Sequence, residues 1–415
     1  MNPEDIKRNQ NLLLLYFLYT TFHGALRKWV FVGSSGINNV LFFVQLIMPF
    51  LMMYFFKKDK SIFAYQPLLI YAFALTGFAL NPMNATIYHG IFGFILHFGF
   101  WMLIITYVNE RASFPIEKLT NAFIIVCFFQ ICLTTVQFTL PATHFLNRYD
   151  SADNVDGFEN DMGVRVTATF SYIAGYGCYL YFVGLLLWAL MIENKKPILV
   201  VLPLLVFSII SAFMNGSRGV MVSFFLSVII GLVSYGGFGN KIKIGAVVGL
   251  ILIIGSIYDL DKNFTVAERA FTAFYGRVKY GQTSGEAGGR TTKTFAAVTD
   301  FEGKYPLFGL GLGATYQGAV SKWGKSQQLI ENGYYEEEPE RILLEGGYAL
   351  FIIRCLLFLY LASQLKIPLV YSVPVLFYLF FFTQMVFNSY QAAFTFLGLA
   401  LVDKMYFLKD EAPPQ

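Results

Sequence analysis

Residues 202–233, LPLLVFSIISAFMNGSRGVMVSFFLSVIIGLV, decide the fold of this chain. Two apolar runs, 202–213 and 220–233, flank a short polar notch that contains Arg218. Neither run has the polar face that a helix of a large soluble protein needs. A guanidinium between two such runs is costly unless it meets water, a partner or an anion. Arg218 is therefore a candidate functional residue.

The composition extends this interpretation to the whole chain. The 415 residues are 56% hydrophobic and only 13% charged, whereas about a quarter of the residues are charged in a soluble domain. Apolar runs of bilayer-spanning length recur from end to end. We predict an all-α integral membrane protein, a single polytopic membrane domain over residues 1–415 with about twelve transmembrane helices. The expected spans are roughly 10–30, 38–56, 65–80, 88–108, 119–140, 168–192, 197–214, 219–235, 242–258, 342–363, 367–386 and 390–407.

The distribution of basic residues supports this count, because short cytoplasmic loops carry an excess of Lys and Arg. With the N-terminus inside, every short inner loop carries at least one basic residue, and the short outer loops carry few. An odd number of spans would invert the pattern. We therefore expect both termini in the cytoplasm.

Two outer loops are long. The first, 141–167, is acidic and ends close to Arg165. The second, 259–341, lies between the ninth and tenth predicted spans and has aromatic residues and helical patterns throughout. A loop of this length is usually functional when it is ordered, so we predict a partly helical lobe outside the membrane.

Arginines from three segments reach this outer face: Arg165, Arg218, and a set in the second loop that includes Arg277, Arg290 and Arg341. Arginine suits phosphate because its planar fork binds two oxygens and stays charged. Taken singly, each arginine is better explained as an interface anchor or an ion-pair partner. Arg165, Arg218 and Arg290 favour an anion site as a set, because glycine or small residues flank them.

An acidic turn precedes the tenth span. It contains Glu336, Glu338 and Pro339, and it leads into Arg341 and Glu345 at i,i+4. Proline and carboxylates in a first turn predict a helix N-terminus. This pair lies at the outer boundary of the membrane, where a site for a lipid-linked substrate is expected.

Other motifs favour structural roles. The run 309–313, GLGLG, predicts a tight turn after Pro306 rather than a phosphate loop, since no strand–helix context surrounds it. His97 and Arg354 fall within spans, where we expect interhelical hydrogen bonds, and a proton-relay role stays open. The four cysteines also fall within spans, so we expect no disulfide. No metal-ligand spacing or basic tract occurs, so we expect no metal, no cofactor and no nucleic-acid partner.

Five motifs together resemble the O-antigen polymerase and O-antigen ligase superfamily of membrane glycosyltransferases. The first three are 24–29, GALRKW; 165–170, RVTATF, which resembles an R-x-x-G-T-F motif with Ala168 in place of the usual glycine; and 216–219, GSRG. The fourth is Gly289-Arg290 followed by 306–313, PLFGLGLG, and the fifth is 336–347, EEEPERILLEGG. Ligases of this superfamily usually carry a His-Asn pair where this chain has the glutamate run, so the polymerase-like members are the nearer match.

The resemblance implies a GT-C-like architecture and a function. The function is polymerisation of undecaprenyl-diphosphate-linked repeat units into a surface polysaccharide at the periplasmic side of a bacterial inner membrane. It implies that Arg218 and Arg290 bind the diphosphate, while Arg165 and Arg277 contact the substrate. Glu338, or alternatively Glu336, would be the general base, with Arg341 and Glu345 orienting that segment.

The implied partners are the lipid-linked glycan donor and acceptor, the lipid bilayer, a chain-length regulator and other membrane proteins of the polysaccharide pathway. Two alternatives stay open. One is a ligase that transfers a finished glycan to a lipid or protein. The other is a flippase for lipid-linked glycans, although no internal repeat of the kind that transporters show is evident.

Overall fold

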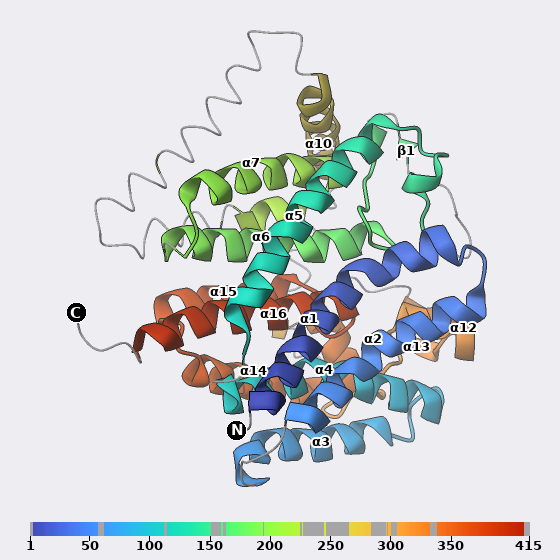
Figure 1. The fold of residues 1–415 in the computed structure, drawn as a ribbon. Helices are drawn as coiled ribbons and strands as arrows, with labels where there is room; N and C mark the ends of the chain where they lie inside the picture. Colours follow the sequence, from blue (N-terminus) through green and yellow to red (C-terminus); the bar gives the residue numbers. More distant parts are fainter. Residues whose placement is uncertain are drawn as a thin grey trace. The chain divides into compact units, whose positions relative to one another are not determined.

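The computed structural model describes residues 3–56, 62–111, 114–150, 159–160, 163–193, 195–224, 226, 245, 265–283, 296, 298–299, 305–332 and 338–410 (Figure 1). Helices dominate these residues, and the one ladder is a two-residue antiparallel pair, β1 (Glu159–Asn160) with β2 (Gly163–Val164). The longer helices are α1 (Pro3–Ala25), α2 (Ser35–Phe56), α3 (Gln66–Ala79), α4 (Ile87–Asn109), α5 (Ile116–Thr139), α6 (Ile173–Ile192), α7 (Ile198–Asn215), α10 (Thr265–Thr283), α14 (Glu338–Gln364), α15 (Leu369–Phe382) and α16 (Ser389–Asp410). The shorter ones are η1 (Leu26–Val30), η2 (Ile62–Tyr65), η4 (Phe145–Asn147), α12 (Gln317–Trp323) and α13 (Gln327–Asn332).

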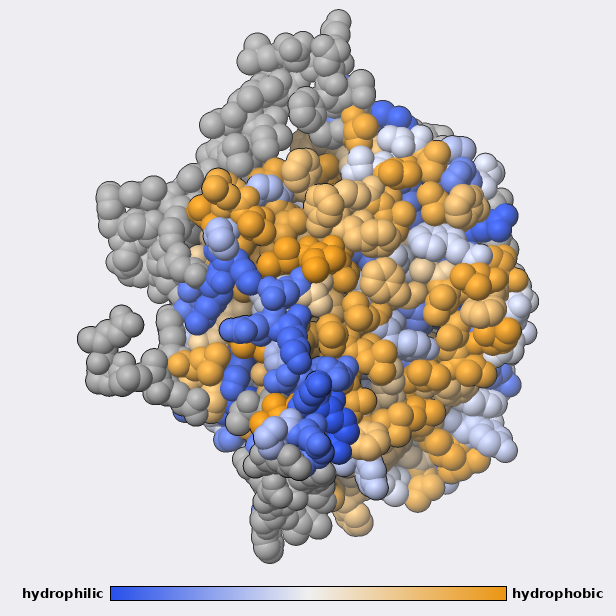
Figure 2. Space-filling view, in the orientation of Figure 1, coloured by the Kyte–Doolittle hydropathy of each residue, from blue (hydrophilic) through white to orange (hydrophobic). Residues whose placement is uncertain are grey.

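Seven helices within the described residues are long and apolar enough to cross a membrane: α2, α4, α5, α6, α7, α14 and α16. Their outward faces are apolar as well, since Ile125 on α5, Leu199 on α7 and Leu359 on α14 are each more than 60% exposed. Figure 2 shows apolar side chains over much of the face in view. Water would penalise exposed apolar faces of this extent, whereas lipid would not. The chain is therefore a multi-pass helical membrane protein.

Most predicted spans coincide with a helix. The span predicted at 168–192 begins later, at Ile173, because residues 165–172 form an irregular segment that is held by side chains of neighbouring helices. Most of the two spans predicted at 219–235 and 242–258, and much of the second long loop, lie outside the described residues.

The chain divides into two compact units. The first comprises 1–13, 44–114 and 285–396, and the second comprises 14–43, 115–284 and 397–415. In the first unit, α3 packs on α4 and on α14, and α14 packs on α15. In the second, α7 packs against α5, α6 and α10. Figure 1 shows α10 beside the C-terminal end of α7.

The span predicted at 342–363 is interrupted. Within α14, Gly347 has φ 64° and ψ −167°, so the helix breaks there. Arg354 Nη2 nevertheless lies 3.0 Å from Glu338 Oε1, although sixteen residues of straight helix would separate them by about 24 Å. The chain therefore folds back at Gly347, and α14 consists of two helical segments joined by a sharp bend.

Residues 306–313 fill that bend. Leu310 N donates to Leu344 O, Gly311 N to Glu345 O, and Ala349 N to Leu307 O. These bonds satisfy backbone groups that the break would leave unpaired in a membrane. Gly309 has φ 69°, and a Cβ there would overlap the backbone of Glu345 and Gly346. The prediction of a tight, closely packed turn is confirmed.

Candidate functional site

The first unit holds a buried charge network on α14, α4 and the loop that precedes α12, consisting of Glu338, Arg341, Glu345, Arg354, His97 and Thr315. The Glu345 carboxylate accepts hydrogen bonds from His97 Nε2 at 3.1 Å, Gly313 N at 2.8 Å, and Thr315 N and Oγ1 at 2.9 and 2.6 Å. Four such bonds saturate a carboxylate. Glu345 therefore fastens α4 and the 306–316 loop to α14.

Arg341 joins the same network through Thr315. Its Nε donates to Thr315 Oγ1 and its Nη2 to Thr315 O, both at 3.0 Å, while its guanidinium stacks 3.6 Å from the ring centre of Phe387. The predicted pair, Arg341 and Glu345, thus meets across Thr315. This arrangement fits the expected role of orienting the segment.

Glu338 lies at the other end of the network and is 1% exposed. Its Oε1 accepts from Arg354 Nη2 at 3.0 Å, and its Oε2 accepts from Val386 N at 2.7 Å. A general base must reach the hydroxyl that it deprotonates. Both oxygens of Glu338 already have partners, so this geometry favours a structural role and leaves a role as the base to be tested.

His97 and Arg354 were expected to bond between helices. His97 on α4 does so with Glu345 on α14, as predicted. Arg354 bonds to Glu338 across the bend of its own helix and stacks against Trp101 of α4, with its guanidinium carbon 5.4 Å from the ring centre.

The second unit holds an arginine cluster, consisting of Arg165, Arg218 and Arg277, around the notch that ends α7. Gly216 caps α7 with φ 70°, and a Cβ there would overlap the Arg277 guanidinium. A Cβ on Gly281 would likewise overlap Arg218 Nη1. The two glycines therefore make room for the two guanidiniums between the notch and α10.

Arg165 completes the cluster. Its Nε donates to Asn215 O at 3.1 Å, at the last residue of α7. Burial and the nearby positive charge of Arg165 lower the pKa of Arg277 to about 10. All three side chains are half-buried. The structure thus brings together three of the arginines that the sequence singled out.

Buried side chains shape the segment that carries Arg165. Asn215 Nδ2 donates to Val166 O and Ile173 O, and Gln137 bonds both the N–H and the carbonyl of Ala168. Ala168 has φ 48° and is the one non-glycine residue with positive φ among those described. Glycine adopts this conformation without strain, whereas the Cβ of alanine makes it unfavourable.

Two predicted site residues, Arg290 and Glu336, lie outside the described residues. The roles of Thr315, Gln137 and Asn215, which organise the two sites, were not predicted from the sequence. The sequence could have indicated a role for Gln137 together with Gln130. Their amide side chains are seven residues apart in an apolar span and therefore lie on one helical face.

Two aromatic residues of the second long loop, Trp323 and Tyr275, differ in their surroundings. Trp323 stacks on Tyr88 with ring centroids 6.1 Å apart and also packs edge-on against Phe92, which favours a packing role. Tyr275 on α10 is 60% exposed.

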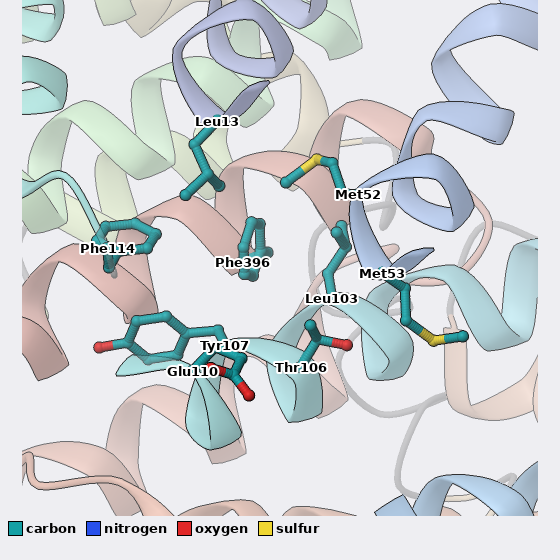
Figure 3. Close-up of a pocket in the computed structure, with 9 residues that line it drawn as sticks. All are labelled: Leu13, Met52, Met53, Leu103, Thr106, Tyr107, Glu110, Phe114 and Phe396. Carbon is teal, nitrogen blue, oxygen red and sulfur yellow. The ribbon is translucent and has the colours of Figure 1, made fainter. Parts of the chain in front are cut away.

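A pocket in the first unit is lined mainly by apolar side chains (Figure 3). Its polar groups are Thr106, Tyr107 and Glu110, from the C-terminal end of α4. It contains no arginine, so it does not suit a diphosphate. Among the described residues, no three His, Cys, Asp or Glu side chains gather to hold a metal ion.

No family model, curated protein or solved structure matches this chain. Its function must therefore be argued from the two sites themselves.

Proposed function

We propose that this protein is a membrane glycosyltransferase that polymerises lipid-linked oligosaccharide repeat units. The observation that supports the proposal is the arginine cluster in the second unit, where three half-buried guanidiniums converge on the glycine notch. Bringing like charges together costs free energy, and a bound anion offsets that cost. Guanidiniums bind the oxygens of a diphosphate in pairs.

The proposed reaction is a direct displacement. The acceptor hydroxyl attacks the anomeric carbon of the donor sugar, and the bond from that carbon to the diphosphate oxygen breaks. The lipid diphosphate leaves with the electron pair, and a base takes the hydroxyl proton. Arg218, Arg277 and Arg165 stabilise the charge on the leaving group, and Arg290 is the further arginine that the resemblance assigns to it.

The architecture proposed for this function has about twelve spans, with both termini in the cytoplasm and the site on the periplasmic face of a bacterial inner membrane. The seven candidate spans and the basic inner loops support it. The substrate would be an undecaprenyl-diphosphate-linked glycan, as the superfamily resemblance implies.

The base is proposed among the glutamates of the acidic turn, Glu338 and Glu336. To act as the base, Glu338, which is 1% exposed, must become accessible to the acceptor hydroxyl. A double variant, Glu338→Gln with Arg354→Met, separates the two roles of Glu338, because it removes both charges of the pair. Turnover survives in this variant if Glu338 only holds the fold, and it is lost if Glu338 is the base.

The proposal is tested by incubating the purified protein with an undecaprenyl-diphosphate-linked oligosaccharide. A ladder of repeat lengths is expected, and it should disappear in Arg218→Ala and Arg277→Ala while both variants remain inserted and folded. A single product of one transfer step would indicate a ligase instead. Full-length polymer from both variants would rule out the diphosphate assignment.

A further inference from the structure

Lys28 is a buried lysine that the proposed reaction does not use. It lies in the π-helix η1, and its side chain is 1% exposed. Its Nζ donates to Thr167 Oγ1 at 2.6 Å and to Ala168 O at 2.5 Å, and it lies 4.7 Å from the ring centre of Trp29. Both acceptors are neutral, and no carboxylate within the described residues forms an ion pair with it. Burying an ammonium in this way is costly, so its position calls for an explanation.

The two acceptors belong to the turn that follows Arg165. Ala168 within that turn is left-handed, a conformation that strains a residue with a Cβ. The Gln137 amide already bonds the N–H and the carbonyl of Ala168. Lys28 adds two further hydrogen bonds, one to Thr167 Oγ1 and one to Ala168 O. Side chains from two separate segments, Gln137 and Lys28, therefore hold the strained turn.

The same segment is fixed upstream of the turn. Arg165 O accepts from the Tyr149 hydroxyl at 2.9 Å, and Val166 O accepts from Asn215 Nδ2 at 3.0 Å. Arg165 therefore projects from a short stretch held at Asn215 on one side and at Lys28 on the other. Removing the Lys28 side chain would free the Thr167–Ala168 turn, and this turn sets the direction of the stretch that carries Arg165.

We propose that Lys28 is a positioning residue for the arginine cluster, because it fixes the Thr167–Ala168 turn and thereby the direction of Arg165. The inference rests on the proposed function where it concerns the anion. The placement of Arg165 itself can be measured without any ligand.

The first measurement is therefore the rate at which phenylglyoxal modifies Arg165 in the detergent-solubilised full chain, followed by peptide mass spectrometry. Lys28→Met should change this rate several-fold. Lys196→Met is the matched control, because Lys196 lies in the same unit and bonds Asn121 Oδ1 in an exposed contact. An unchanged Arg165 rate in folded Lys28→Met protein would overturn the proposal.

A second variant covers the case in which Lys28→Met does not fold. Thr167→Ala removes one of the two acceptors and leaves the lysine in place. The rate at which phenylglyoxal modifies Arg165 should then differ from that of the wild-type protein. The change should be smaller than the one expected for Lys28→Met, because one of the two hydrogen bonds of Lys28 remains. No shift in the folded Thr167→Ala protein would also overturn the proposal.

The third measurement is a double-mutant cycle read as affinity for inorganic diphosphate. Lys28→Met and Arg165→Ala should each weaken binding about tenfold, and the double variant should bind about as well as Arg165→Ala alone. Additive losses, about a hundredfold in the double variant, would show that Lys28 does not act through Arg165. If the wild-type protein binds no diphosphate, the proposed function fails, while the labelling rates still decide the role of Lys28.

Discussion

The two polar sites of this protein differ in the sign and the burial of their charges. In the charge network of the first unit, two arginines and two glutamates are almost fully buried, and each carboxylate oxygen has a donor. In the arginine cluster of the second unit, three guanidiniums of the same sign gather and stay half-buried. Buried charges of opposite sign that bond to one another hold a fold together, whereas like charges gathered at a partly open notch suit an incoming anion. Mutations in the two sites should therefore affect different properties.

The largest effect on stability is expected at Glu338. Glu338→Gln leaves the buried Arg354 guanidinium without its carboxylate, and breaking a buried ion pair on one side costs about 3–5 kcal/mol. The free energy of unfolding in detergent measures this loss. Adding Arg354→Met should recover part of it, because the unpaired charge is then gone.

Glu340→Gln is the control for this prediction. Glu340 lies on the same turn but is only half-buried, and it accepts a hydrogen bond from the Tyr305 hydroxyl. We expect a loss of about 0.5–1 kcal/mol there. Equal losses at the two glutamates would contradict the view that the charge network is the stabilising one.

The bend in α14 gives the second test. Gly347→Ala places a Cβ against the carbonyl oxygens of Pro306 and Leu307 at a residue with φ 64°. A loss of about 2–4 kcal/mol is expected, because strain and overlap add. Gly99→Ala is a suitable comparison, because a Cβ there meets no atom within 4 Å; it should be neutral or slightly stabilising. If the two alanine variants are equally stable, the chain does not fold back at Gly347.

The arginine cluster should show the reverse pattern. Arg218→Ala and Arg277→Ala should change the free energy of unfolding by less than about 1 kcal/mol, since removing one like charge relieves repulsion. Polymer synthesis should fall at least about a hundredfold, because the diphosphate then loses one of the guanidiniums that bind it. Arg218→Lys should fail as well, since lysine lacks the planar fork. A large loss of stability with normal synthesis would make the cluster structural.

The smallest effect is expected at Ala168. Ala168→Gly relieves the left-handed strain but adds freedom to the unfolded chain. A net gain of about 0.5–1 kcal/mol in the free energy of unfolding is expected. Ala168→Val, which adds bulk at a fully buried residue, should be clearly destabilising. A glycine variant less stable than the parent would show that the turn is not strained.

The sequence was sufficient for the helical membrane class and for most helix positions, because apolar runs as long as 119–140 have few alternative structures. It also identified Arg165, Arg218 and Arg277 and the tight glycine turn at 309–313. It could not show the break at Gly347, because a glycine inside an apolar run is compatible with a continuous helix. Nor could it pair Arg354 with Glu338, because such contacts depend on the bend.

The central claim is that the arginine cluster binds the diphosphate of a lipid-linked glycan. The most direct measurement is the affinity of the purified protein for an undecaprenyl-diphosphate-linked oligosaccharide, compared with that of Arg218→Ala, Arg277→Ala and the control Glu340→Gln. Binding by the wild-type protein and by Glu340→Gln, with a loss of at least about tenfold in each arginine variant, is the expected result. Equal affinity in all four proteins would contradict the claim.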